Sequence, residues 1–133
     1  MLNDLKLYAA MLVAFFAIDM VWLGLVARHF YRRHLGFLLA PDVNWIAAVL
    51  FYLLFIAGIL VFVVLPGLDA HSLKKTLMLG AFFGLVTYAT YDLTNLATVK
   101  NWPLAVTIVD MIWGTVLSTL VGCAGYLTGI RLL

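Results

Sequence analysis

Four long apolar stretches constrain this chain more than any other feature of its sequence. Each is long enough to cross the hydrocarbon core of a bilayer as an α-helix, which needs roughly 20 predominantly apolar residues. Because the apolar residues are continuous and do not alternate every second position, they indicate helices and not the strands of a membrane barrel. The stretches run from about Leu5 to Ala27, Trp45 to Leu65, Leu73 to Ala97 and Pro103 to Thr128.

The composition excludes a soluble domain. Of the 133 residues, 66% are hydrophobic and 11% are charged, whereas soluble domains have roughly 45–50% apolar and about 25% charged residues. The net charge of +2 and the single Cys123 argue against a nucleic-acid-binding protein and against a secreted disulfide scaffold. We therefore predict one all-α integral membrane domain over residues 1–133, an antiparallel four-transmembrane-helix bundle. Its surroundings are the lipid bilayer, and no nucleic acid is expected among its partners.

The segment between the first two stretches mixes cationic and apolar side chains. Such a segment suits the headgroup layer of a membrane, so we predict an interfacial first loop. Arg28, Arg32 and Arg33 are its candidate contacts to lipid headgroups. The alternative is that these arginines only anchor the end of the first helix. Lys and Arg residues divide evenly between the two sides, so the positive-inside rule does not set the orientation.

Three aspartates fall inside the predicted spans, namely Asp19, Asp92 and Asp110. A charged side chain at mid-membrane costs on the order of 2.5–3.5 kcal/mol, so each needs a reason to be there. At a rise of about 1.5 Å per residue, the three lie roughly 12, 8 and 10 Å from the same side of the membrane, and Tyr52 lies at roughly 10 Å. We therefore predict one polar layer to which all four helices contribute.

Helical spacing places aromatic side chains beside each aspartate. Positions three, four and seven residues apart share one face of a helix. By this spacing Asp92 shares a face with two tyrosines and with Asn95. Asp19 lies three residues before Trp22, and Asp110 lies three residues before Trp113. Intramembrane acids normally face the interior of a bundle. The candidate ligand-binding residues are Asp92, Asp19, Asp110, Asn95, Tyr88, Tyr91, Tyr52, Trp22 and Trp113.

Three kinds of function are compatible with this layer. It could bind a proton, a cation, or a small hydrophobic or cationic ligand, with transport as one use, because aromatic faces beside carboxylates attract amines. It could be a membrane-embedded enzyme site acting on a lipid, with an aspartate as general acid or base. It could be a structural or partner-binding network of interhelical hydrogen bonds. The acids themselves could be protonated and hydrogen-bonded to the tyrosines and Asn95, could pair with Arg28 or another arginine of the first loop, or could hold a cation as their counter-charge.

No cofactor and no metal is expected. The carboxylates could form an oxygen shell with Asn95, but all three histidines, His29, His34 and His71, lie in predicted loops. No nucleotide-binding motif or haem ligand pattern is present. Small residues form two strips, Gly80 to Gly84 and Gly114 to Gly125, which predict close packing of helices within the chain. A homodimer formed through one strip is the alternative.

Several motifs resemble a bacterial membrane family named domain of unknown function 2177. They are Asp19 to Gly24, Phe30-Tyr31, Leu39 to Pro41, Phe51-Tyr52, Tyr88 to Thr98, Trp102-Pro103 and Val109 to Gly114. The most specific is the Tyr-Asp-Leu-Thr-Asn sequence that begins at Tyr91. The resemblance covers nearly the whole chain and implies a small, multi-pass, four-helix protein of the bacterial inner membrane. Since the family has no assigned activity, it implies no catalytic residue.

Overall fold

The computed structural model describes residues 1–132, which fold into helices and contain no β-strand. The all-α prediction is therefore confirmed for this part of the chain. Two of the long helical segments are built from shorter pieces, because each contains a π-helical turn. The elements are α1 (Leu2–Val21), the π-helix η1 (Trp22–Val26), α2 (Arg28–Leu35), α3 (Trp45–Ile59), the π-helix η2 (Leu60–Val64), α4 (Leu65–Asp69), α5 (Leu73–Thr98) and α6 (Leu104–Leu132).

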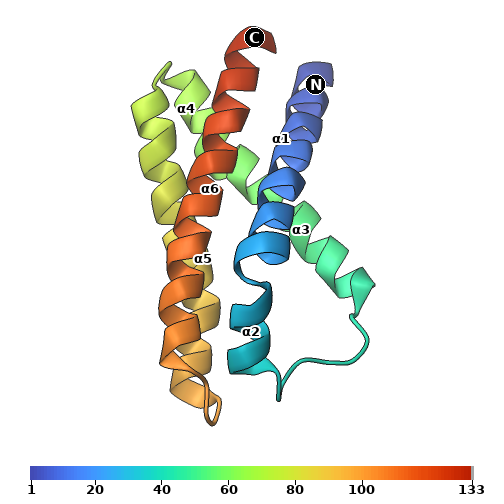
Figure 1. Cartoon of the computed structure of the whole chain (residues 1–133). Coiled ribbons are helices and arrows are strands. Elements are labelled where there is room, and N and C mark those ends of the chain that lie inside the picture. The colour runs from blue at the N-terminus through green and yellow to red at the C-terminus, as the bar shows by residue number, and fades with distance from the viewer. Residues whose placement is uncertain (133) are drawn as a thin grey trace.

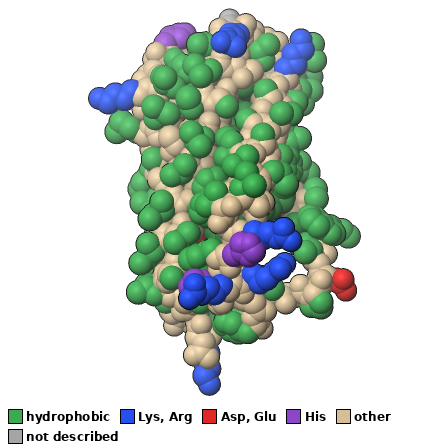
Figure 2. Space-filling view, viewed as in Figure 1, with side chains coloured by type: hydrophobic (Ala, Val, Ile, Leu, Met, Phe, Trp, Pro, Cys, Tyr) green, Lys and Arg blue, Asp and Glu red, His purple; other side chains and the backbone are tan. Residues whose placement is uncertain are grey.

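Among the described residues, three helical segments are long and apolar enough to cross a membrane: Leu2–Val26, Trp45–Asp69 and Leu104–Leu132. Figure 2 shows hydrophobic side chains over the middle of the molecule and Lys and Arg side chains toward its two ends. A belt of this kind matches a bilayer, in which the apolar surface faces lipid and the cations reach the headgroups. The structure is that of a membrane protein.

Helix α5 is as long as these segments but carries more hydroxyl groups. Thr90, Thr94 and Thr98 follow one another at every turn, and each donates a hydrogen bond to the backbone carbonyl four residues earlier. A hydroxyl bonded to its own helix needs no water. The polar composition of α5 is thus compatible with an apolar environment.

Local sequence signals explain where the helices begin. The side chain of Asn44 accepts a hydrogen bond from Ala47 N at the start of α3, and Ser72 accepts one from Lys75 N at the start of α5. Both residue types are favoured at this position because they satisfy a free backbone N–H. Pro66 does not end the second long helix as the sequence predicts. It lies in the first turn of α4, where no N–H is required of it, and the helix continues to Asp69.

The predicted headgroup-layer segment contains a short helix, α2. Its more buried positions lie four residues apart, at Ala27, Tyr31 and Leu35, so one side of α2 faces the protein. The three arginines of the segment are exposed. Figure 1 shows α2 beside the ends of α5 and α6 that lie farthest from the chain termini.

The helices pack around α6. Figure 1 shows α5 and α1 beside α6, both termini at one end of the molecule, and α3 leaning away from the other helices toward its own N-terminus. Helices α5 and α6 approach most closely at Gly84 and Gly114, where a Cβ atom on Gly84 would overlap the Gly114 carbonyl. In a membrane, helix association depends on such close packing, since lipid is as apolar as leucine. The predicted glycine strips therefore join helices within the chain.

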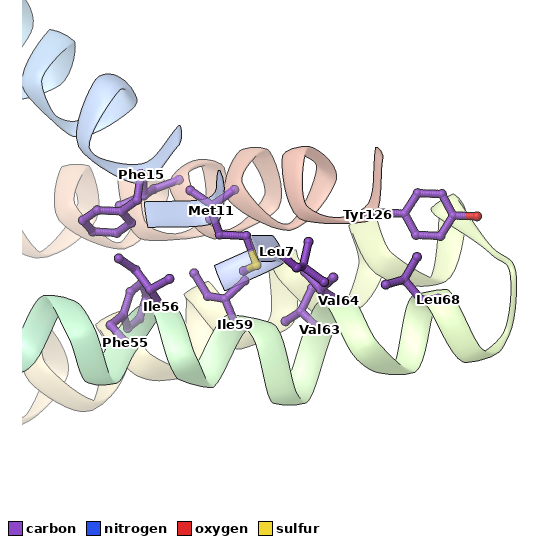
Figure 3. Packing of buried hydrophobic residues seen from close by; sticks show 12 residues of the cluster. Leu7, Met11, Phe15, Phe55, Ile56, Ile59, Val63, Val64, Leu68 and Tyr126 are labelled. Atoms are coloured by element: carbon purple, nitrogen blue, oxygen red, sulfur yellow. The ribbon is translucent and has the colours of Figure 1, made fainter. Parts of the chain in front are cut away.

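The apolar core occupies the half of the molecule nearer the termini (Figure 3). Met11, Ile56 and Ile59 are fully buried there, and Phe15 closes the core toward the other half. The polar layer begins where this core ends. The buried members of the core cluster are Leu7, Met11, Phe15, Phe55, Ile56, Ile59, Val63, Val64, Leu68, Leu117, Val121 and Tyr126.

Candidate functional site

Asp110 is joined to the short helix α2. The hydroxyl of Tyr31 donates a hydrogen bond to Asp110 Oδ1 over 2.7 Å. Burial, together with this hydrogen bond, raises the pKa of Tyr31 well above its usual range. Tyr31 therefore remains a neutral donor, and the bond fixes the orientation of one carboxyl oxygen of Asp110.

Asp92 is the most buried acid of the chain. Its side chain is 0% exposed, and neither carboxyl oxygen receives a hydrogen bond from any group in residues 1–132. The carboxyl group lies within interaction range of that of Asp110. The antiparallel contact of Gly84 with Gly114 places the two aspartates on the same side of this contact, because Asp92 lies about two turns after Gly84 and Asp110 lies about one turn before Gly114.

No cation compensates these acids in the described part of the chain. The single ion pair there joins the N-terminal amine to Asp4 at 3.7 Å, far along α1 from the polar layer. The open possibility that Arg28 pairs with a buried aspartate is therefore not realised, and Arg28 is exposed. Two carboxyl groups thus lie side by side in an apolar setting without a basic partner.

Asp19 contributes the third carboxyl group, at the end of α1. Its side chain is 6% exposed. One turn farther, at the start of η1, the ring of Trp22 stacks on that of Trp113 with centroids 4.4 Å apart and planes 6° apart. The same ring meets Tyr31 edge-on at 6.4 Å. This aromatic group closes the space between α1, α2 and α6.

Two cavities meet at Asp110. The first has a volume of about 300 Å³ and lies between α3, α5 and α6. The second has a volume of about 250 Å³ and reaches α1 and α2. Phe51, Tyr88 and Asp110 line both, so they form the partition between the two spaces. Tyr88 reaches this position because Gly114 has no side chain: a Cβ atom there would overlap the Tyr88 ring.

The structure brings most of the predicted site residues together. One cavity is lined by six of them, which are Asp19, Trp22, Tyr52, Tyr88, Asp110 and Trp113. Tyr91 lines the other, and Asp92 is among the lining residues of neither cavity. Asn95 is not among the residues that line either cavity, although it was expected on the same face as Asp92. Over residues 1–132, no three His, Cys, Asp or Glu side chains gather as metal ligands.

The chain matches a family described as "Predicted membrane protein (DUF2177)" over residues 4–127. The chain belongs to this family. The resemblance found in the Tyr91 to Asn95 motif is thereby confirmed, and the family description agrees with the apolar belt of this DUF2177 protein. No curated protein and no solved structure matches the chain, so the chemistry of the site has to be inferred from its own geometry.

Sequence reasoning missed seven residues that line the two cavities of this DUF2177 protein: Phe15, Leu23, Tyr31, Ala48, Phe51, Phe55 and Thr87. A signal for Tyr31 existed, because Ala27, Tyr31 and Leu35 have the four-residue spacing of one helical face. Phe51 and Phe55 also lie four residues apart, on either side of Tyr52. Nothing in their spacing distinguishes a wall of the site from a surface facing lipid.

Proposed function

We propose that this DUF2177 protein holds positive charge inside the membrane. The empty pocket carries a proton on the Asp92–Asp110 pair, and the filled pocket binds a small organic cation such as an amine. One observation carries the proposal: Asp92 is fully buried, beside a second carboxyl group, with no hydrogen-bond donor or basic side chain from residues 1–132.

The physical argument rests on the cost of burying charge. An uncompensated carboxylate in an apolar interior is strongly unfavourable, so it takes up a proton or acquires a cation. Two adjacent carboxyl groups reinforce this demand, because they cannot both remain ionised at low cost. The rings of Tyr88 and Phe55 line the cavity beside Asp110, and aromatic faces attract ammonium groups. An amine would therefore find both a counter-charge and a suitable wall.

The alternatives receive less support from the same geometry. A purely structural network would satisfy its buried members, whereas both oxygens of Asp92 lack a donor within residues 1–132. An enzyme acting on a lipid would use a positioned acid–base or nucleophile pair. The hydrogen bond at the site joins Tyr31 to Asp110, and it holds the carboxyl group in place without creating a nucleophile.

We also propose that α5 spans the membrane, which makes the protein a four-span antiparallel bundle in a bacterial inner membrane. Its length, its internally bonded threonines and the buried Asp92 support this topology. The exposed Arg28, Arg32 and Arg33 would then contact lipid headgroups on the side opposite the termini.

Cysteine labelling tests this topology. In a Cys123→Ser background, Lys74→Cys lies at the start of α5 and Lys100→Cys lies just beyond its end. A membrane-impermeant maleimide added to intact cells should label one of them, and both only after the cells are opened. Labelling of both from the same side would show that α5 does not span.

Proton release tests the binding function. The purified protein in phosphatidylcholine nanodiscs is titrated with n-butylamine hydrochloride in weak buffer that contains a pH indicator. We expect release of about one proton for each amine bound, because the cation replaces the proton of the carboxyl pair. Asp92→Asn should abolish the release. Asp69→Asn, which removes an exposed acid, is the matched control and should behave like wild type.

Infrared difference spectra of the same samples test the empty state. A protonated-carboxyl band should be present in wild type, disappear when amine is added, and be missing in Asp92→Asn. A wild-type protein that shows neither this band nor any amine binding would overturn the proposal.

A further inference from the structure

We infer that the ligand of this site is an amphiphile, a protonated amine that carries one alkyl chain and enters sideways from the bilayer. The inference rests on the proposed function for its amine, which it places at Asp110. It adds a position for the alkyl chain, in the groove between α3 and α5.

The groove is an apolar depression of about 460 Å³. It exists because α3 leans away from α5 (Figure 1), so that the two helices are joined mainly through η2 and α4. Phe83 of α5 and Phe62 of η2 form its walls, with ring centroids 6.2 Å apart. Its lining comprises Phe51, Leu54, Phe55, Ala57, Gly58, Val61, Phe62, Phe83 and Thr87.

The groove adjoins the cavity that holds Asp110. Phe51, Phe55 and Thr87 line both spaces, so only these side chains lie between the groove and the cavity. The hydroxyl of Thr87 donates to the Phe83 carbonyl of its own helix over 2.8 Å and therefore offers the groove no free hydrogen-bond donor. A molecule that lay across both spaces, past these side chains, would meet an apolar wall along most of its length and a carboxyl group at one end.

This distribution of polarity specifies the occupant. The helical segment from Phe51 of α3 to Val61 of η2 is roughly 15 Å long at about 1.5 Å per residue, which suits an alkyl chain of medium length. The carboxyl groups of Asp110 and Asp92 would repel a carboxylate or a phosphate at the same end. Tyr88, Tyr91 and Phe51 surround that end with rings, which favour an ammonium group.

The headgroup of the ligand must decide which amphiphile the site selects. When an alkyl chain moves from the bilayer into the groove, it exchanges one apolar environment for another, so the chain alone contributes little binding free energy. An ordinary bilayer phospholipid could fill the groove by its chains only, because the carboxyl groups of the site would repel the phosphate of its headgroup. A chain-bearing amine is distinguished from it by the contact with Asp110, and the test therefore compares molecules that share a chain and differ in head.

Photolabelling makes this comparison. The protein in phosphatidylcholine nanodiscs is labelled with dodecylamine that carries a diazirine in its chain, and the labelled peptides are identified by mass spectrometry. Labels should fall on residues 51–62 and 83–91. Unlabelled dodecylamine should compete, whereas lauric acid at the same membrane mole fraction should compete on the order of tenfold less well. Asp110→Asn should remove this difference.

Two variants separate the groove from the carboxyl site. Val61→Trp fills the groove and should lower dodecylamine labelling several-fold, while proton release by n-butylamine remains at the wild-type level. Ala57→Phe fills the same groove at a second position if Val61→Trp fails to fold. Val13→Trp adds the same ring to an exposed position of α1 outside the groove, and should leave labelling unchanged.

The outcomes distinguish the two proposals. Equal competition by dodecylamine and lauric acid would show a groove that holds only ordinary chains, and would overturn this inference. Dodecylamine labelling that is unaffected by both groove-filling variants would overturn it as well. In either case, if n-butylamine still binds and releases protons, the proposed function stands. If neither amine binds, the proposed function fails together with the inference.

Discussion

Tyr31 and Asp110 are 79 positions apart in the sequence, and a hydrogen bond of 2.7 Å joins them. This bond attaches α2 to α6 at the wall between the two cavities. It shows that the segment after the first long helix is docked on the other helices. A short helix with an exposed basic side also supplies a phenol to the buried acid cluster.

Tyr31→Phe should loosen α2 and free Asp110. The substitution keeps the ring that packs on Trp22 and removes only the hydroxyl. We expect the free energy of unfolding to fall by about 1–2 kcal/mol, since a hydrogen bond to a carboxyl group is lost at a partly buried site. Thermal unfolding in detergent measures this. Tyr126→Phe is the control, because the Tyr126 hydroxyl makes no hydrogen bond within the described residues. An equal loss in both variants would refute the assigned role of the bond.

Asp92→Leu should stabilise the protein while abolishing amine binding. A buried carboxyl group without a partner is replaced by an apolar side chain of similar size, and such exchanges are neutral or stabilising by about 1–3 kcal/mol. Unfolding in mixed micelles with increasing sodium dodecyl sulfate measures the change. A structural network predicts the opposite sign, so a marked loss of stability would favour that interpretation over a binding site.

Gly114→Ala should destabilise the contact between α5 and α6. The new methyl group would overlap the Tyr88 ring, and overpacking of this kind costs about 1–3 kcal/mol. Gly24→Ala is the matched substitution, because nothing lies within 4 Å of a Cβ atom at that position. There the higher helix propensity of alanine should add about 0.5–1 kcal/mol. Melting temperatures of the two variants should therefore shift in opposite directions, and a shift in the same direction would contradict the packing described.

The alkaline pH dependence of stability should report on Tyr31. Burial and the bond to Asp110 raise its pKa in the folded protein, so folding favours the neutral phenol. This contribution is fully present below the unfolded pKa of about 10 and is lost as the pH rises from there toward the folded value. The free energy of unfolding should therefore fall above about pH 10 in wild type and fall less steeply in Tyr31→Phe. Identical alkaline slopes for the two proteins would show that Tyr31 is not held neutral by the fold.

The all-helical class could be predicted from the sequence, because a long continuous apolar run indicates a helix that crosses a lipid bilayer. The sequence did not predict the π-helical turns, the docking of α2 or the lean of α3. These features depend on contacts between helices, and hydropathy describes each helix by itself. The Pro66-Gly67 pair illustrates the limit, since a proline ends a helix in most contexts but is tolerated in the first turn after a π-helix.

The part of the candidate site that could be predicted from the sequence is the set of polar residues at one depth in the membrane, because depth follows from a residue's position along its helix. Asp19, Tyr52 and Asp110 were expected at one level, and they line one cavity. Asn95 was expected with them, because it lies three residues after Asp92. Helical period defines a broad face, but the crossing of α5 with α6 decides which part of that face is covered. Phe51 and Phe55 became part of the site only through the lean of α3, which no spacing reveals.

The π-helical turn η2 determines how the site-lining side chains of α3 are rotated about the helix axis relative to α4. A turn closed by a bond to the fifth residue holds one residue more than a regular α-helical turn, and one residue corresponds to about 100° of rotation. Everything on α3 before Leu60 is therefore rotated relative to α4, which stays packed in the core. Removing one residue from 60–64 would restore a regular helix with its backbone bonds intact, yet turn Phe51 and Phe55 away from Asp110. A single-residue insertion or deletion at this turn is thus a route by which such a chain could acquire or lose its pocket while keeping its fold.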